Sequence, residues 1–218
     1  MIGKDVKPVE YSRKIDFFNS LTHAVGAVLS VVGLIMLTLR AEGTRYVISA
    51  VVYGAALVSV YTISTVYHAL SQGESKRRMR MVDHATVPFL IAGTATPCAL
   101  ISLYEVKPVL GILVFSLGWL CAFFGFFSKL FFFEKLKAVT MAVYMVSGFI
   151  MLCSVIPVHD RINMGAFSYL VYGCVFYVIG AILCGLGVKR PWLHVVFHVF
   201  VLLGSAFHFY VIYSFVIK

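Results

Sequence analysis

Charged residues are scarce in this chain of 218 residues. They make up 12% of it, with 9 acidic and 18 basic side chains, whereas 61% of the residues are hydrophobic. The mean hydropathy is +0.96. In soluble domains, roughly a quarter of the residues are charged. So few charges exclude an ordinary soluble protein and predict a polytopic membrane protein.

The chain also lacks paired cysteines and a basic nucleic-acid surface. Its five cysteines fall inside apolar segments without CxxC spacing, so we interpret them as small buried residues, not as a disulfide framework or thiolate cluster. Basic residues do not interleave with aromatic residues on a soluble element, so the net charge of +9 does not predict nucleic-acid binding. No small-residue cleavage site follows a short apolar region. The first apolar run, Asn19 to Leu39, is therefore expected to be a transmembrane helix and not a removable signal.

Long apolar runs dominate the sequence. Seven of them are long enough for a bilayer crossing of about 20 residues, namely residues 19–39, 47–70, 84–103, 108–128, 136–156, 166–187 and 192–217. The loops between them are short, and no internal repeat is visible. This pattern predicts an all-α fold, a seven-transmembrane-helix bundle formed by residues 17–218. A short basic cytoplasmic segment, residues 1–16, precedes it.

Lys and Arg residues are shared unevenly between the two sides that these spans define. The N-terminal segment and the second, fourth and sixth loops hold 4, 4, 3 and 2 of them, which is 13 of the 18, and the other side holds 5. Cytoplasmic loops of membrane proteins carry an excess of Lys and Arg. The distribution predicts a cytoplasmic N-terminus and a C-terminus outside the cell.

Histidines from two spans fall at the same predicted depth, near the cytoplasmic side. "STVYH" places His68 at the end of the second span, and "LHVVFH" places His194 and His198 in the first turns of the seventh. Residues four apart share one helix face, so His194 and His198 can bind one ion. Three neutral imidazoles with a fourth position open to water form a catalytic zinc site. We therefore predict Zn²⁺ bound by His68, His194 and His198.

Two polar residues are the predicted catalytic partners of this metal. Asp83, in "VDHATVPF", lies at the same depth and would hydrogen-bond the metal-bound water or orient a histidine. Ser64 shares a helix face with His68, although a serine in a membrane helix commonly bonds its own i−4 carbonyl. The alternative for the His194 and His198 pair is a packing or interhelical hydrogen-bond feature.

"DFFNSLTH" at the start of the first span provides secondary candidates, Asp16, Asn19 and His23. Asn19 could cap the helix while Asp16 favours its positive end. His23 lies beyond a plausible cap, and we expect it to orient the metal cluster or to close its entrance.

Other histidines and prolines receive weaker predictions. His208 is fourteen residues from His194, about 21 Å along a helix, which is too far to share an ion. His84 points about 100° away from Asp83 and is a candidate either for supporting the metal ligands or for a helix interface. Pro88 and Pro97 are expected to kink or locally unwind the third span.

Four motifs together resemble the hemolysin III family, the bacterial branch of the progestin and adipoQ receptor superfamily. They are "NSLTH" at 19–23, "STVYH" at 64–68, "VDHATVPFLIAGTATP" at 82–97 and "HVVFH" at 194–198. The resemblance implies a seven-helix protein of the bacterial cell membrane with an intramembrane zinc ion. It implies His68, His194 and His198 as ligands, with Asp83 and Ser64 beside the metal-bound water. One departure is that the family usually has a glutamate shortly before the Asn-x3-His element, where this chain has Asp16.

Three functions follow from these residues and from the resemblance, which extends to membrane hydrolases such as the alkaline ceramidases. The leading hypothesis is a zinc-dependent hydrolase that cleaves the amide or ester bond of a lipid entering from the membrane. The first alternative is a regulator of membrane state with a structural zinc and no turnover, as in receptor members of the superfamily. The second is lysis of foreign membranes, which the lack of an amphipathic, insertable segment argues against.

Overall fold

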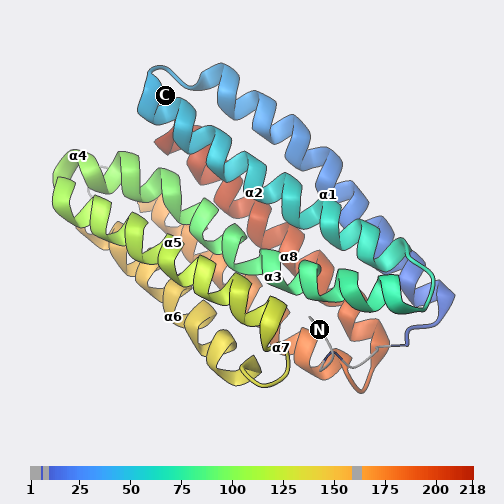
Figure 1. Ribbon diagram of the computed structural model, residues 1–218. Helices are drawn as coiled ribbons and strands as arrows, with labels where there is room; N and C mark the ends of the chain where they lie inside the picture. The colour runs from blue at the N-terminus through green and yellow to red at the C-terminus, as the bar shows by residue number, and fades with distance from the viewer. Residues whose placement is uncertain (1–5, 7–9, 159–163) are drawn as a thin grey trace.

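The computed structural model describes residue 6, residues 10–158 and residues 164–218 (Figure 1). All regular elements within these residues are helical. The long helices are α1 (Arg13–Arg40), α2 (Thr44–Ala69), α3 (Glu74–Pro97), α5 (Pro108–Phe131), α6 (Lys137–Val155), α7 (Met164–Gly187) and α8 (Pro191–Val211). Short segments complete the chain, namely η1 (Cys98–Leu103), α4 (Tyr104–Val106), η2 (Ile156–Val158) and η3 (Ile212–Val216).

Six helices among the described residues are long and apolar enough to cross a membrane. One of them combines α3, η1 and α4 and spans Glu74–Val106. The predicted span at 136–156 corresponds to α6, whose apolar part, Lys137–Cys153, is shorter than the other six. The all-α, polytopic membrane architecture is thus confirmed.

Helix α1 shows how the bundle is organised for a lipid environment. Its buried positions recur every three or four residues and include small or polar ones, such as Asn19, His23 and Gly26. Its outer face is apolar, with Val28 66% and Leu39 83% exposed. A surface helix of a soluble protein has the opposite arrangement. Polar side chains therefore face other helices, where they can find partners that lipid does not offer.

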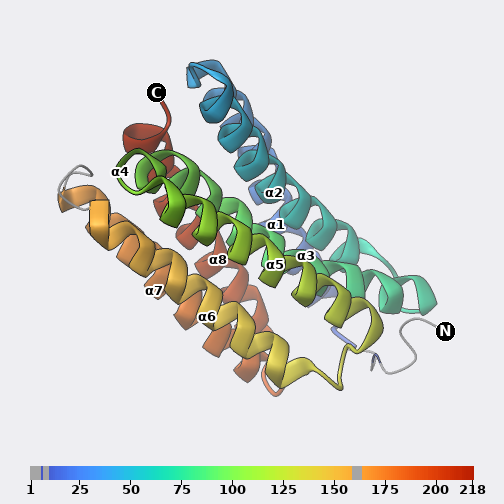
Figure 2. The same ribbon diagram turned by 60° about the vertical axis from the view of Figure 1, so that its left-hand side comes forward.

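The packing of α1, α2, α3 and α8 positions the polar residues. Helix α1 packs against α2 and α8, and α2 also packs against α3. The start of α1, the end of α2, the start of α3 and the start of α8 meet at one end of the bundle (Figures 1 and 2). A buried cluster that includes Leu37, Tyr53, Tyr61 and Ile212 fills the space between these helices.

Local unwinding, one of the two effects expected of the prolines in the third span, is found after Pro97 and not at Pro88. The helix continues through Pro88, and a π-helical stretch, η1, follows Pro97 directly. Proline removes a backbone donor, and π-turns are one way in which a helix accommodates the change. The local irregularity therefore lies at the far end of α3, away from Asp83.

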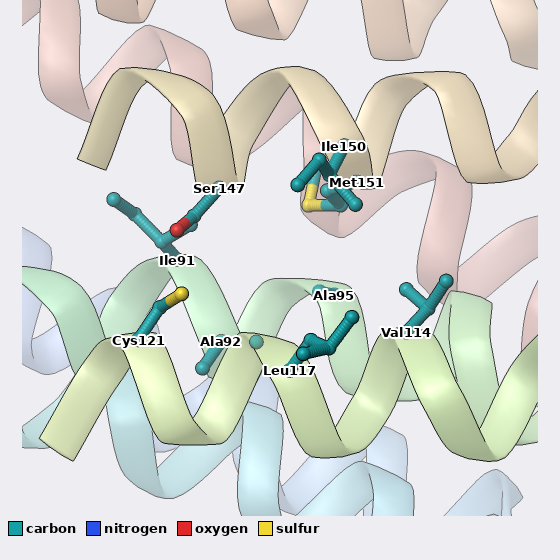
Figure 3. A pocket seen from close by; sticks show the side chains of 10 residues that line it. Ile91, Ala92, Ala95, Val114, Leu117, Cys121, Ser147, Ile150 and Met151 are labelled. Carbon is teal, nitrogen blue, oxygen red and sulfur yellow. The ribbon is translucent and has the colours of Figure 1, made fainter. Parts of the chain in front are cut away.

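A small apolar cavity lies between α3, α5 and α6 (Figure 3). Its volume is about 20 Å³, and its lining includes Ile91, Ala95, Leu117 and Met151. Ser147 is the polar residue of this lining. The cavity offers no group of side chains suited to catalysis or metal binding.

Candidate metal centre

Three histidines from two helices converge at the end of the bundle described above. His68 lies in the last turn of α2, whereas His194 and His198 lie in the first two turns of α8. One ring nitrogen from each lies within 4.8 Å of those of the other two. His68 and His198 are buried and His194 is half-buried. The cluster could hold a metal ion, as the sequence predicts.

His68 is oriented by Asp16, which lies near the start of α1. Its Nδ1 is 3.5 Å from Asp16 Oδ1, while its Nε2 is buried without a hydrogen-bond partner among the described residues. Leaving such an atom unsatisfied costs about 1–3 kcal/mol. Metal-binding histidines typically donate one ring nitrogen to a carboxylate and use the other as ligand. The surroundings of His68 therefore fit a metal at Nε2.

Lys76 holds the same carboxylate from the other side. Its Nζ lies 2.7 Å from Asp16 Oδ2 and donates a second hydrogen bond to the Leu70 carbonyl at 3.1 Å. The residue is only 3% exposed. A buried ammonium needs a counter-charge and hydrogen-bond acceptors, and this site supplies both. The contacts join the starts of α1 and α3 to the end of α2.

His198 is oriented by Thr22 of α1. Its Nδ1 lies 3.3 Å from Thr22 Oγ1. The Thr22 hydroxyl has backbone acceptors at Phe18 and Asn19, 3.0 and 2.9 Å away, so its own proton goes to a carbonyl. Oγ1 then accepts a hydrogen bond from the Nδ1–H group, which leaves Nε2 as the lone-pair nitrogen of His198.

His194 lies next to a thiol and an aromatic ring, whereas the other two histidines contact a carboxylate or a hydroxyl. Its Nδ1 lies 3.9 Å from Cys184 Sγ on α7, and its ring stacks on Tyr11 at a centroid distance of 5.3 Å. Burial raises the pKa of Tyr11 to about 12, so the phenol stays neutral beside the cluster. Tyr11 and Cys184 therefore cover the half-buried side of the centre without adding charge.

Asp83 and Ser64, the predicted catalytic residues, lie on α3 and α2 near His68. Ser64 is buried on α2, one turn before His68, and Asp83 is half-buried on α3. Ser64 and His68 both lie close enough to the Asp83 carboxyl to influence it electrostatically. A carboxylate, a hydroxyl and a histidine from two helices thus come together.

Asn19 and His23 also belong to the polar end of the bundle. The His23 ring lies 3.9 Å from that of His198, centroid to centroid. His23 Nδ1 and both amide atoms of Asn19 are buried without hydrogen-bond partners among the described residues. The capping role considered for Asn19 is wrong, because Ser12 caps α1 through the Ile15 amide at 3.4 Å.

Among the described residues, His208 and His84 do not belong to the three-histidine group. His208 is buried farther along α8, with Nε2 3.1 Å from the Leu170 carbonyl, so it is a separate residue as predicted. His84 packs edge-on against Phe133 at 5.2 Å. His159, expected in an outer loop, lies outside the described residues. The five cysteines are free thiols, and the prediction that they are buried is correct for Cys98, whereas the other four are only partly buried.

Sequence reasoning missed Thr22, Lys76 and Tyr11. Thr22 stands inside the "NSLTH" motif, directly before His23, so the motif carried a signal for it. Lys76 was counted only as one of several loop cations. Nothing in the spacing distinguishes it from Arg77 or Arg78, because its burial depends on contacts with α1 and α2.

A polytopic helical membrane protein with a buried histidine cluster is the class that these observations define. The model of the family described as Haemolysin-III related matches residues 11–209, which include the whole candidate centre. The chain therefore belongs to this family, the hemolysin III branch of the progestin and adipoQ receptor superfamily. It is a multi-pass protein of the bacterial cell membrane.

Relatives match almost the full length of the chain. It is 32% identical to Hemolysin-3 of Bacillus cereus over 207 residues, which cover 94% of this chain and 93% of that protein. It is 30% identical to the Hemolysin-3 homolog of Bacillus subtilis (strain 168) over 211 residues, with 95% and 97% covered. The human Monocyte to macrophage differentiation factor is 27% identical over 205 residues, with 92% and 84% covered. The similarity thus extends from bacterial to human proteins.

Proposed function

We propose that this protein is a zinc-dependent hydrolase that cleaves the amide or ester bond of a membrane lipid. The observation that carries the proposal is His68, held at Nδ1 by Asp16 and unpartnered at its buried Nε2, within a cluster of three histidines. Asp83 and Ser64 lie next to it. These residues combine a metal-ligand set with a proton acceptor.

His68, His194 and His198 would hold the zinc ion. Three imidazole nitrogens leave a fourth position for water or substrate, which is the ligand set of many catalytic zinc sites. When bound, zinc lowers the pKa of a coordinated water to about 7 and polarises a carbonyl. Asp16 and Thr22 would keep two of the three imidazoles in the tautomer that presents Nε2.

Asp83 is the proposed general base and acid. Its carboxylate accepts a proton from the attacking water and passes it to the departing amine or alcohol. The Ser64 hydroxyl holds that carboxylate in place by a hydrogen bond. Burial of the surrounding residues limits access from bulk water, so a lipid would enter the site sideways between helices.

We further propose seven crossings, with α6 as the fifth, and a cytoplasmic N-terminus. The 13-to-5 distribution of Lys and Arg in the sequence supports this orientation. Lys4, Lys7 and Arg161 of that count lie outside the described residues. The orientation would place the metal centre in the cytoplasmic leaflet. Accessibility of single cysteines introduced in the loops, measured with a membrane-impermeant thiol reagent, tests it.

The decisive experiment is a lipid screen with the purified, zinc-loaded protein. Ceramides, phospholipids and acyl amides are incubated with the wild type and with Asp83→Asn, which leaves the three histidines intact. We expect product from one lipid class in the wild type and a loss of at least 100-fold in the variant. A zinc-loaded wild type that cleaves none of them contradicts the proposal.

A regulator with a structural metal is the second candidate. The observation that favours it is the buried contact set of Asp16, His68 and Lys76, because it joins the ends of three helices. A metal there would stabilise the bundle without turnover. This candidate predicts that metal removal lowers the melting temperature while the lipid screen yields no product.

Lysis of foreign membranes is the third candidate, and it is supported by the printed name of the Bacillus cereus relative, Hemolysin-3. Release of haemoglobin from erythrocytes by the purified protein tests it. Release that is lost in His198→Ala would connect lysis to the histidine cluster. No release at any protein concentration would remove this candidate.

A further inference from the structure

A second cavity lies beside the metal centre and is lined by strongly charged side chains. It has a volume of about 280 Å³, which is room for many more than one water molecule. Lys76, Arg77 and Arg80 of α3 line it, together with Glu10 and Tyr67. It lies between the end of α2, the first turns of α3 and the segment before α1.

Cations outnumber anions in this lining. Three of its residues are basic, and Glu10 is the acidic one. Arg77 donates Nε and Nη2 to Glu74 at 2.7 Å, and Lys76 pairs with Asp16 at 2.7 Å, so both side chains are held in place by carboxylates with which a phosphate would share them. Guanidinium groups bind phosphate through parallel hydrogen bonds, and held side chains lose less entropy on binding.

The cavity adjoins the histidine cluster through two of its lining residues. The Tyr67 ring lies 4.5 Å from the His68 ring, centroid to centroid. Lys76 reaches the carboxylate that contacts His68 Nδ1. A ligand held in the cavity would therefore lie next to the candidate metal centre.

We propose that this cavity binds a phosphate group. At the end of a membrane bundle such a group comes from a phospholipid headgroup or from free phosphate. Clusters of four or more Lys and Arg at the end of a transmembrane helix attract anionic lipids. Residues 76–80, "KRRMR", carry four basic side chains, of which three line the cavity. The site requires no turnover, so it stands or falls independently of the proposed hydrolase.

The test compares three arginine variants of the full chain purified in detergent. Arg77→Gln and Arg80→Gln remove a cation from the cavity. Arg78→Gln is the matched control, because Arg78 lies on the same helix and also pairs with Glu74, at 2.9 Å, but does not line the cavity. Binding of short-chain phosphatidylglycerol, short-chain diacylglycerol and inorganic phosphate is measured by calorimetry. Circular dichroism and gel filtration verify that each variant is folded.

We expect phosphatidylglycerol to bind and diacylglycerol not to bind. The affinity for phosphatidylglycerol should fall about tenfold in Arg77→Gln and in Arg80→Gln, since losing one hydrogen bond to a charged group weakens binding by about this factor. Arg78→Gln should change it less than twofold. Glu10→Gln should raise this affinity severalfold, because the variant removes a negative charge that repels the phosphate.

Each outcome decides the proposal. Inorganic phosphate that binds as tightly as the lipid assigns the site to free phosphate, and weaker binding assigns it to the headgroup; both results support a phosphate site. Equal losses in all three arginine variants would show general surface attraction and overturn the proposal. Diacylglycerol binding as tight as phosphatidylglycerol binding overturns it as well, as does the absence of any binding.

Discussion

Asp16 Oδ1 lies 3.5 Å from His68 Nδ1, and this contact joins the start of α1 to the end of α2. The other oxygen of the same carboxylate lies 2.7 Å from Lys76 Nζ. The family usually has a glutamate near this position, yet the shorter aspartate reaches both partners here. It does so because α1 begins at Arg13, before the predicted span, and already holds Asp16 in helical geometry against α2.

The histidine cluster should control the metal content of the protein. His198→Ala is expected to reduce bound metal from about one ion per chain to near none and to lower the melting temperature, since a ligand that binds the folded state stabilises it. Elemental analysis of the purified protein measures the first effect and thermal unfolding the second. His208→Ala is the control, because His208 is equally buried on α8 but lies outside the cluster. Full metal content in His198→Ala would refute the assignment.

Asp16 should affect both metal affinity and stability. Asp16→Asn removes the carboxylate behind His68 and is expected to weaken metal binding 10- to 100-fold. It also leaves Lys76 buried without its counter-charge, which costs about 3–5 kcal/mol. The double variant Asp16→Asn, Lys76→Met should recover most of the stability but none of the metal affinity. If it recovers both, Asp16 acts only as a structural counter-ion.

Thr22 should act through its hydroxyl group. Thr22→Val keeps the shape of the side chain but removes the acceptor 3.3 Å from His198 Nδ1, so we expect metal affinity to fall at least tenfold. Thr22→Ser should retain it. Thr38→Val is the matched control, because Thr38 makes the equivalent backbone hydrogen bonds on α1, to Leu34 and Ile35, and has no hydrogen bond to a histidine among the described residues. Competition with a chelator of known affinity measures the difference.

Gly173 should be essential for the packing of α7 on α8. A Cβ at this position would overlap the imidazole of His208, which is 2% exposed and has no room to move. Overpacking of this kind costs about 1–3 kcal/mol, so Gly173→Ala should lower the melting temperature in detergent. Gly118→Ala is the control, because a Cβ there meets nothing within 4 Å. A melting temperature unchanged in Gly173→Ala would mean that the His208 side chain moves aside without penalty.

Local patterns explain why much of this protein was predictable. The apolar runs and the three-and-four spacing of buried residues in α1 are properties of single helices, so the sequence carries them directly. The same is true of His194 and His198, whose spacing places both on one face of α8. Asn19 shows the limit of such reasoning. A helix start was inferred near it, but Ser12 caps α1 two turns earlier.

The sequence alone determined a helical membrane protein with His68, His194 and His198 at one level. Only the tertiary structure decided which ring nitrogens are engaged, and it did so through Asp16 and Thr22. It also decided that Lys76 is buried while Arg78 on the same helix is exposed. These outcomes depend on how α1, α2, α3 and α8 rotate and cross. Helix rotation is set by side-chain packing between distant segments, which no local pattern specifies.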